Sequence, residues 1–216
     1  MRLKAFTLIT AATAALALAA IATAAVIIGT PRDDVLRGTA RADEIHGLAG
    51  DDRIYALDGN DDVRSGSGND GARAANGNDL VYGGRGSDIL AGGDGSDRLY
   101  GGSDPDTVLG GDGADRAAGN RGDDAVSGND GPDSLFGGWG ADRVFGESGD
   151  DVLHALAPDD QPDLLNCGSG SDKAFVLRSE RPRTALVGCE EVVVVDTLTA
   201  DQEEGENADA DAEADA

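Results

Sequence analysis

The sequence predicts an all-β fold, a parallel β-roll (solenoid) of nine-residue repeats. Three observations predict this fold. Aspartate recurs every nine residues over 14 units, an apolar residue follows each aspartate by two positions, and glycine precedes most of them by two. Composition agrees, because 33 glycines and only 4% aromatic residues exclude an ordinary globular core built from large side chains.

The aspartate register runs without a slip through the middle of the chain. The aspartates are Asp34, Asp43, Asp52, Asp61, Asp70, Asp79, Asp88, Asp97, Asp106, Asp115, Asp124, Asp133, Asp142 and Asp151. In many proteins aspartate and glycine merely mark turns. A turn needs no aspartate at a fixed offset in every unit, however, so the register indicates a further role for the carboxylates.

Each part of the unit has a physical task. Glycine supplies the backbone freedom that a tight turn requires. The last three residues of a unit alternate polar, apolar and polar, which predicts a very short strand with one side chain inward. Such strands bury their apolar residue only when copies stack. Two units make one coil with a turn on each side, so alternate aspartates should form two ladders.

The charge of these ladders requires a cation. The formal net charge is -25, and carboxylates stacked about 4.8 Å apart repel by roughly 3 to 4 kcal/mol per pair. Domains have only about 5 to 15 kcal/mol of net stability. Because the available ligands are carboxylate and carbonyl oxygens, the sequence favours several Ca²⁺ ions over softer metals or Mg²⁺. The same acidic excess excludes nucleic acid as a partner.

At this point the sequence resembles the RTX, or haemolysin-type, calcium-binding repeat family, whose unit is G-G-x-G-x-D-x-U-x. Residues 83–91 show the unit most clearly, and the resemblance spans about residues 28–153. It implies a right-handed parallel β-roll with calcium held between the loops of successive coils, two units apart. The metal ligands that it implies, together with loop carbonyls, are Asp52, Asp61, Asp70, Asp79, Asp88, Asp97, Asp106, Asp115, Asp124, Asp133, Asp142 and Asp151.

Several units depart from this pattern. Arg32 and Arg41 replace glycine in the first two loops, where a guanidinium group can stand in for calcium, so Asp34 and Asp43 are left out of the ligand set. Asp104 replaces the glycine two positions before Asp106 and tolerates the left-handed region less freely. The first glycine of a unit is replaced by Ala56, Ser65 and Ala74, and weaker sites are expected there.

The first 25 residues predict a secretory signal peptide. Arg2 and Lys4 form a basic start, residues 6–25 are uncharged, and Ala22, Thr23 and Ala24 offer a small-residue cleavage site. The alternative is an uncleaved membrane anchor, because about 20 apolar residues can span a bilayer. The segment is rich in alanine and threonine, which insert weakly, so we expect cleavage, export to an extracellular or envelope location, and no membrane span afterwards.

The repeats are expected over residues 26–154 and a C-terminal cap over residues 155–196, where the period breaks and one further unit occurs. In an exported chain, Cys167 and Cys189 favour a disulfide over a metal site. We therefore expect this disulfide to staple the cap. Residues 197–216 are acidic and contain no aromatic or basic residue, which predicts a disordered, solvated tail.

No active site is expected. His46 and His154 each follow an inward residue by one position, which predicts two distant surface histidines. By the same spacing Tyr82, Tyr100 and Phe136 point outward from successive coils of one face. Such an aromatic stripe can bind a glycan, cell-surface or protein partner, and stacking of the rings along the ladder explains it equally well.

The sequence therefore predicts an exported, non-enzymatic protein that folds on binding calcium between stacked G-x-D loops. It would act as a structural or adhesive element or sequester calcium. The alternative is the secretion or targeting module of an RTX-type toxin or hydrolase, but the signal segment runs straight into the repeats and leaves no room for a catalytic domain. A β-helix lyase would need longer coils and a bulkier core.

Overall fold

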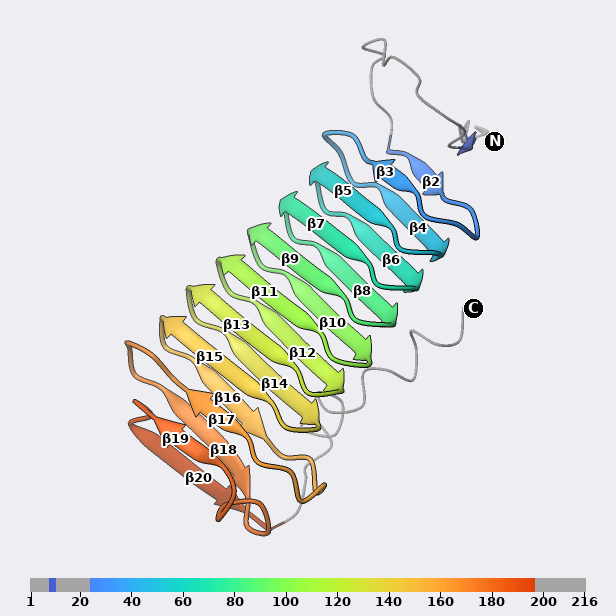
Figure 1. Ribbon diagram of the computed structural model, residues 1–216. Helices are drawn as coiled ribbons and strands as arrows, with labels where there is room; N and C mark the ends of the chain where they lie inside the picture. The colour runs from blue at the N-terminus through green and yellow to red at the C-terminus, as the bar shows by residue number, and fades with distance from the viewer. Residues whose placement is uncertain (1–7, 11–23, 197–216) are drawn as a thin grey trace, which may run out of the picture.

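The computed structural model describes residues 8–10 and 24–196, which wind into one elongated solenoid of two parallel β-sheets (Figure 1). The eleven-stranded sheet contains, in spatial order, β1 (Leu8–Thr10), β2 (Val26–Ile28), β4 (Glu44–Ala49), β6 (Asp62–Ser67), β8 (Leu80–Arg85), β10 (Arg98–Ser103), β12 (Arg116–Arg121), β14 (Ser134–Trp139), β16 (Val152–Ala155), β18 (Lys173–Leu177) and β20 (Glu191–Val195). The nine-stranded sheet contains β3 (Val35–Arg37), β5 (Arg53–Asp58), β7 (Gly71–Asn76), β9 (Ile89–Asp94), β11 (Thr107–Asp112), β13 (Ala125–Asp130), β15 (Arg143–Ser148), β17 (Leu164–Asn166) and β19 (Ala185–Val187).

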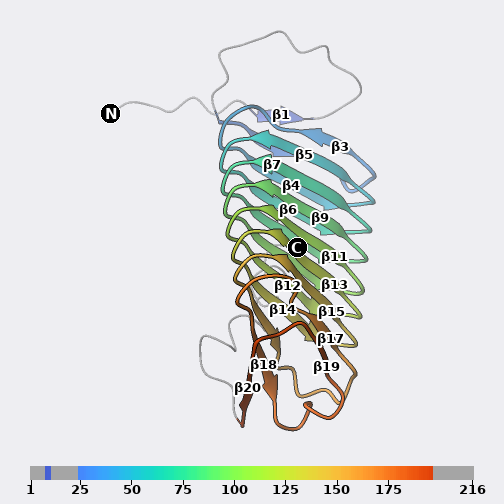
Figure 2. The same ribbon diagram turned by 90° about the vertical axis from the view of Figure 1, so that its left-hand side faces the viewer.

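From β2 onward the chain alternates between the two sheets, so each strand pairs in parallel with the next strand but one. In the repeats the paired residues lie two units apart, as in Leu80 with Arg98 and Ile89 with Thr107. The side view shows the coils stacked along one axis (Figure 2). The all-β parallel solenoid and its two-unit coil are thus confirmed.

The strands are longer than the sequence suggested. A three-residue strand with one inward side chain was expected, whereas the strands of the central repeats are six residues long. β9 buries two residues, the predicted Leu90 and then Gly92. The glycine extends the strand because its lack of a side chain lets it point inward: a Cβ built on Gly92 would lie 2.2 Å from Asp97 Oδ2.

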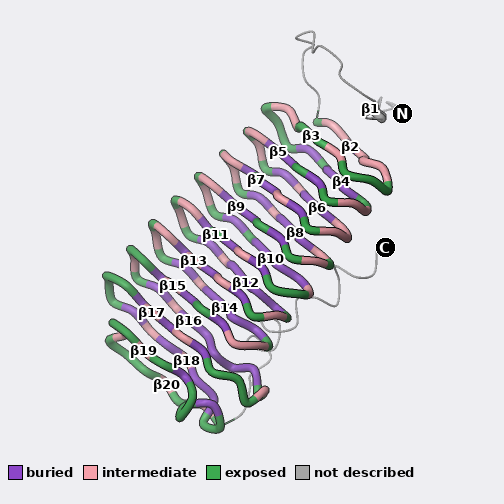
Figure 3. The backbone as a smooth tube through the Cα atoms, in the orientation of Figure 1, coloured by how far each residue is buried: buried purple, intermediate pink, exposed green. Residues whose placement is uncertain are grey.

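The core is a thin apolar column between the sheets. Buried and more exposed residues alternate along most strands of the repeats, and the buried positions at the alternating sites face inward (Figure 3). The residues two positions after each aspartate form the column: Leu36, Ile45, Ile54, Val63, Ala72, Val81, Leu90, Leu99, Val108, Ala117, Val126, Leu135, Val144 and Leu153.

The cap continues the solenoid. β17 pairs with β15, Leu164 facing Arg143, and β18 pairs with β16, Lys173 facing Val152, since three additional residues lie between β16 and β17. β20 returns to the spacing of the repeats in its pairing with β18. The Cys167–Cys189 disulfide is present and joins the turn after β17 to the residue just before Glu190. Each sheet therefore runs into the cap with its register intact.

The N-terminal end touches the predicted signal segment. β1 lies within it and pairs in parallel with β2, Leu8 facing Val26. Cleavage after the predicted site would leave β2 as the first strand of its sheet. Among residues 8–10 and 24–196, no helix has the length and apolar character needed to cross a membrane.

Candidate metal centre

The twelve predicted ligands lie at the inner corners of the turns. Each aspartate directly precedes a strand or its first inward residue, and its side chain points into the solenoid. All twelve, from Asp52 to Asp151, are at most 3% exposed. Carboxylates are almost never so deeply buried unless something pairs with them.

One oxygen of each buried carboxylate is satisfied by the neighbouring coil. The backbone N–H of Asp70 donates to Asp88 Oδ1 at 2.8 Å, and that of Asp88 donates to Asp106 Oδ1 at 2.7 Å. The same bond, 2.7–2.9 Å long, recurs through both ladders. The two ladders that the period predicted are therefore held in register by the aspartates themselves.

The second carboxylate oxygen, Oδ2, differs from Oδ1 in its hydrogen bonding. In nine of the twelve aspartates, and in Asp172 of the cap, Oδ2 is shielded from solvent and makes no hydrogen bond within the described parts of the chain. They are Asp52, Asp61, Asp70, Asp79, Asp88, Asp97, Asp115, Asp133, Asp151 and Asp172. A buried polar atom without a partner costs about 1 to 3 kcal/mol, and more when it is charged. The metal-free solenoid is thus incomplete at these atoms.

Burial makes ionisation of the ladder costly. It raises the pKa of Asp79, Asp88 and Asp133 from the usual 3.8 to about 7, only partly offset by the backbone hydrogen bond to each carboxylate. The pKa of Asp52, Asp61, Asp70, Asp115 and Asp151 is raised to about 6 for the same reason. Such a rise disfavours the ionised form by about 3 kcal/mol per group. Several groups together outweigh the roughly 5 to 15 kcal/mol that stabilises a domain.

The surroundings of Oδ2 fit a hard cation. Around the ideal Cβ position of Gly83, Asp88 Oδ2 and the Gly101 carbonyl oxygen both lie 2.4 Å away, so the glycine lets two oxygens converge where a side chain would otherwise stand. No group of three or more His, Cys, Asp or Glu side chains converges within residues 24–196. Main-chain carbonyls would therefore have to complete any site, and an all-oxygen set of six to eight ligands suits calcium.

The repeats can now be assigned. The sequence profile of the RTX calcium-binding nonapeptide repeat (4 copies) matches residues 28–63, 37–72, 64–99, 73–108, 91–126 and 118–153. These overlapping matches cover well over half of the chain. The chain belongs to the RTX calcium-binding repeat family. A comparison with curated proteins finds no match.

The first two RTX units satisfy their aspartates without an ion. Thr30 donates to Asp34 Oδ2 from its backbone N–H at 2.6 Å and from its hydroxyl at 2.8 Å. Thr39 donates likewise to the two carboxylate oxygens of Asp43. Arg32 and Arg41, expected to stand in for calcium, are exposed and form no ion pair with described residues. Asp34 and Asp43 were left out of the predicted ligand set because of Arg32 and Arg41, but the groups that donate to these carboxylates belong to Thr30 and Thr39.

Three carboxylates of the cap were not predicted as ligands, although the repeat unit that ends in Asp172 was recognised. Asp163, Asp172 and Glu190 continue the two ladders, and each accepts a backbone N–H from the aspartate of the preceding coil. Burial raises the pKa of Asp163 to about 6. The three inserted residues hide this continuation in the sequence, although Asp163 and Asp172 keep an apolar residue two positions later.

The aromatic face is only partly exposed. Tyr82 and Tyr100 are half-buried and stack with ring centroids 5.0 Å apart, as the stacking alternative requires. Phe136 and His154 are 2% and 7% exposed, so they are not the surface residues that the sequence predicted. His154 is enclosed between Phe136 and Phe175, at 4.2 and 5.1 Å. The Arg116 guanidinium carbon lies 4.3 Å from the Phe136 ring centroid.

The histidines form no catalytic arrangement within the described residues. Burial, and secondarily the charge of Arg116, lowers the pKa of His154 to about 4, so its imidazole is neutral at physiological pH. His46 lies near the opposite end of the solenoid and pairs with Glu44 at 2.9 Å. Neither histidine is placed beside a nucleophile.

Proposed function

We propose that this RTX protein is an exported, non-catalytic module that folds when Ca²⁺ binds between successive turns. The buried, unpartnered Oδ2 atoms carry the proposal, because a divalent cation is the partner that they lack. The proposed ligands are the twelve aspartates from Asp52 to Asp151, together with carbonyl oxygens freed by the glycine turns. When bound, calcium would supply positive charge that offsets the burial and mutual repulsion of these carboxylates.

Calcium-dependent folding suits export. A chain whose ladders need calcium would remain unfolded where calcium is scarce and fold by mass action where it is plentiful. Residues 1–25 would direct export and be removed. The Cys167–Cys189 disulfide supports an oxidising destination, where such bonds persist. The proposed acidic tail, residues 197–216, lies outside the described residues.

Outside the cell the protein would serve as a rigid structural or adhesive rod, or sequester calcium. The half-buried Tyr82–Tyr100 stack is the surface that favours adhesion, because paired rings can stack a sugar or a partner side chain. Phe136 is too deeply buried to take part. Replacing both tyrosines with serine should abolish attachment to glycan or cell surfaces while leaving calcium-induced folding intact. Undiminished attachment of the double variant would reject the adhesive role.

The main test is a calcium titration of the purified protein, followed by far-UV circular dichroism. We expect a cooperative gain of β signal that a chelator reverses and that magnesium at the same concentration does not reproduce. A spectrum already fully folded in chelator at neutral pH would overturn the proposal, since the ladders would then tolerate their charge without metal.

A further inference from the structure

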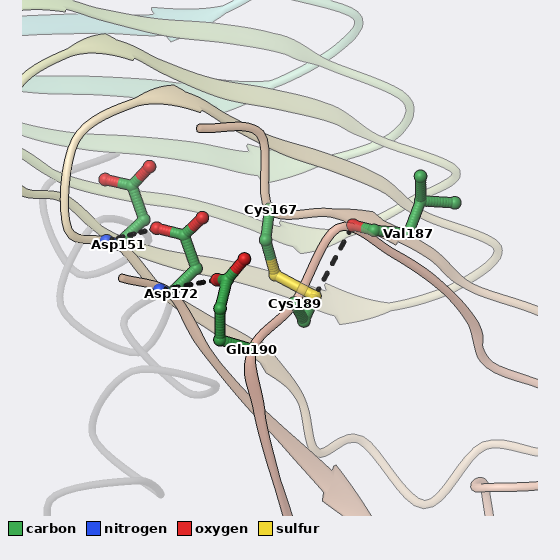
Figure 4. The surroundings of a disulfide bond; sticks show 6 residues. All are labelled: Asp151, Cys167, Asp172, Val187, Cys189 and Glu190. Carbon is green, nitrogen blue, oxygen red and sulfur yellow. Dashed lines mark hydrogen bonds between the residues drawn. A yellow bond between two sulfur atoms is a disulfide. The ribbon is translucent and has the colours of Figure 1, made fainter. Parts of the chain in front are cut away.

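The last turn of the solenoid reproduces the repeat ladder with other residues. The N–H of Asp151 donates to Asp172 Oδ1 and that of Asp172 donates to Glu190 Oε2, both at 2.9 Å. The preceding bond, from Asp133 to Asp151 Oδ1, is equally long. Figure 4 shows Asp151, Asp172 and Glu190 side by side on successive turns. Glu190 therefore occupies the position of the next repeat aspartate.

Asp172 shares the state of the repeat aspartates. It is 1% exposed, and its Oδ2 is buried and makes no hydrogen bond with any described residue. Turn geometry explains the bond to Oδ1 but provides nothing for Oδ2. An unpartnered, deeply buried oxygen at this position indicates a missing ligand in the cap, beyond residue 153, where the last match of the repeat profile ends.

The first turn of the cap supplies a carbonyl oxygen to the preceding aspartate, Asp151, in the repeat manner. At Gly110, the ideal Cβ position lies 2.4 Å from Asp115 Oδ2 and 2.7 Å from the carbonyl oxygen of Gly128. At Gly146, it lies 2.4 Å from Asp151 Oδ2 and 2.2 Å from the carbonyl oxygen of Cys167. Cys167 thus presents its carbonyl to the carboxylate of Asp151 as a repeat glycine does.

The disulfide holds the final carboxylate in place. Cys167 is fully buried and bonded to Cys189, the residue directly before Glu190. Inside the repeats, the next coil pairs with each turn and so holds it in place. Within the described chain no coil follows β20 in its sheet, so the last turn has no such neighbour. Glu190 and Glu191 are both exposed, but Glu191 pairs with Lys173 at 3.0 Å, whereas Glu190 accepts the N–H of Asp172.

We propose that residues 168–171, Asp172 and Glu190 form an additional calcium site at the last turn, with Glu190 positioned by the Cys167–Cys189 disulfide. This inference rests on the proposed function, because it extends calcium binding beyond the matched repeats. The disulfide then has a second task besides stapling the cap, since it positions the terminal ligand that no further repeat can supply.

The test compares two adjacent carboxylates. We expect E190Q to bind one calcium ion fewer per chain than wild type in equilibrium dialysis with radioactive calcium, whereas E191Q binds the same number. In saturating calcium, dithiothreitol should reduce the disulfide of E190Q at least tenfold faster than that of E191Q, and the two rates should converge in chelator. E190D, which restores the repeat residue, should recover the ion.

The outcomes separate this site from the repeats. If wild type binds calcium cooperatively but E190Q and E191Q match it in both ion number and reduction rate, the additional site is overturned and the repeat function stands. If wild type binds no calcium, the proposed function itself fails. Loss of the same ion in a C167A/C189A variant, with calcium-induced β signal retained, would support positioning by the disulfide, and an unchanged ion number would contradict it.

Discussion

The first two units and the units that follow them differ in how they treat the same aspartate. At Asp34 and Asp43, threonine four positions earlier donates to the carboxylate. From Asp52 onward, no residue of the turn reaches Oδ2 in the ten aspartates whose second oxygen lacks a hydrogen bond. One end of the solenoid therefore satisfies its aspartates internally, whereas under the proposed function the rest would depend on calcium.

The two groups of units also differ in the backbone conformation of one residue, the residue four positions before the aspartate. In the later units, the residue four before the aspartate has a positive φ, for example 82° at Leu48 and 122° at Gly93. Thr30 and Thr39 do not adopt this conformation. With negative φ the turn offers its own N–H to the carboxylate, and with positive φ the carboxylate oxygen remains open. The turn conformation thus decides whether an aspartate is satisfied internally or needs a cation.

The largest expected effect concerns protons as a substitute for calcium. Because burial raises the folded-state pKa of the later aspartates to about 6 or 7, the folded state binds protons more tightly than the unfolded chain. The stability of the metal-free chain should therefore rise as pH falls from about 7 and be greatest near and below 3.8, the unfolded value. In chelator, far-UV circular dichroism should show little β signal at pH 7.5 and a clear gain by pH 4.5.

His154 opposes this trend but does not reverse it. Its pKa is lowered from 6.5 to about 4, so its contribution to stability is present above 6.5 and is lost as pH falls towards 4. One such group amounts to about 3 kcal/mol, less than several aspartates together. Light scattering should accompany the titration, because the sequence pI of about 4.1 favours association. Identical spectra of the unassociated chain at pH 7.5 and 4.5 would contradict the prediction.

The second-largest effect is expected from comparing a buried aspartate of the ladder with the exposed aspartate directly before it. Asp124 is fully buried, whereas Asp123 is exposed and accepts the backbone N–H of Ala141 at 3.0 Å. An amide preserves that outer contact, as Asn69 already does for Ser87. D124N should therefore raise the calcium midpoint of folding at least tenfold, and D123N should leave it within about twofold of wild type. Equal midpoints would show that the inner carboxylates are not ligands.

Most of the repeat geometry was predictable because it depends on period alone. The nine-residue spacing determined which side chains point inward and that aspartates two units apart would meet. Asp163, Asp172 and Glu190 were not predicted as ligands, even though the unit ending in Asp172 was recognised, since insertions and a glutamate break the period while the sheets keep their register. The burial of His154 was missed because it depends on Phe175, a residue of the cap that no repeat rule brings beside it.

A smaller effect is expected in the first two units, where threonine donates to the aspartate. T30V removes the hydroxyl donor to Asp34 Oδ2 but keeps the shape of the side chain and the backbone N–H. A hydrogen bond to a charged group contributes about 1.5 to 3 kcal/mol, and partial exposure at this end should reduce the loss to about 1 kcal/mol. Urea unfolding in saturating calcium would measure it. T107V is the control, since Thr107 makes no side-chain hydrogen bond to described residues; losses of equal size would remove the special role of Thr30.

The smallest effect concerns the backbone of the calcium-dependent turns. Leu48 has φ 82° and is 43% exposed, so it carries left-handed strain without burying much of its side chain. Occupying that region costs a non-glycine residue about 1 kcal/mol or more. Glycine avoids this cost but loses part of the gain through its greater unfolded-state entropy. L48G should therefore stabilise the calcium-bound protein by roughly 0.5 to 1 kcal/mol in urea unfolding. L109G is the control, because Leu109 is similarly exposed but lies in β11 with ordinary φ, so its replacement should destabilise the protein. A loss of stability in both variants would show that positive φ at this position is not strained.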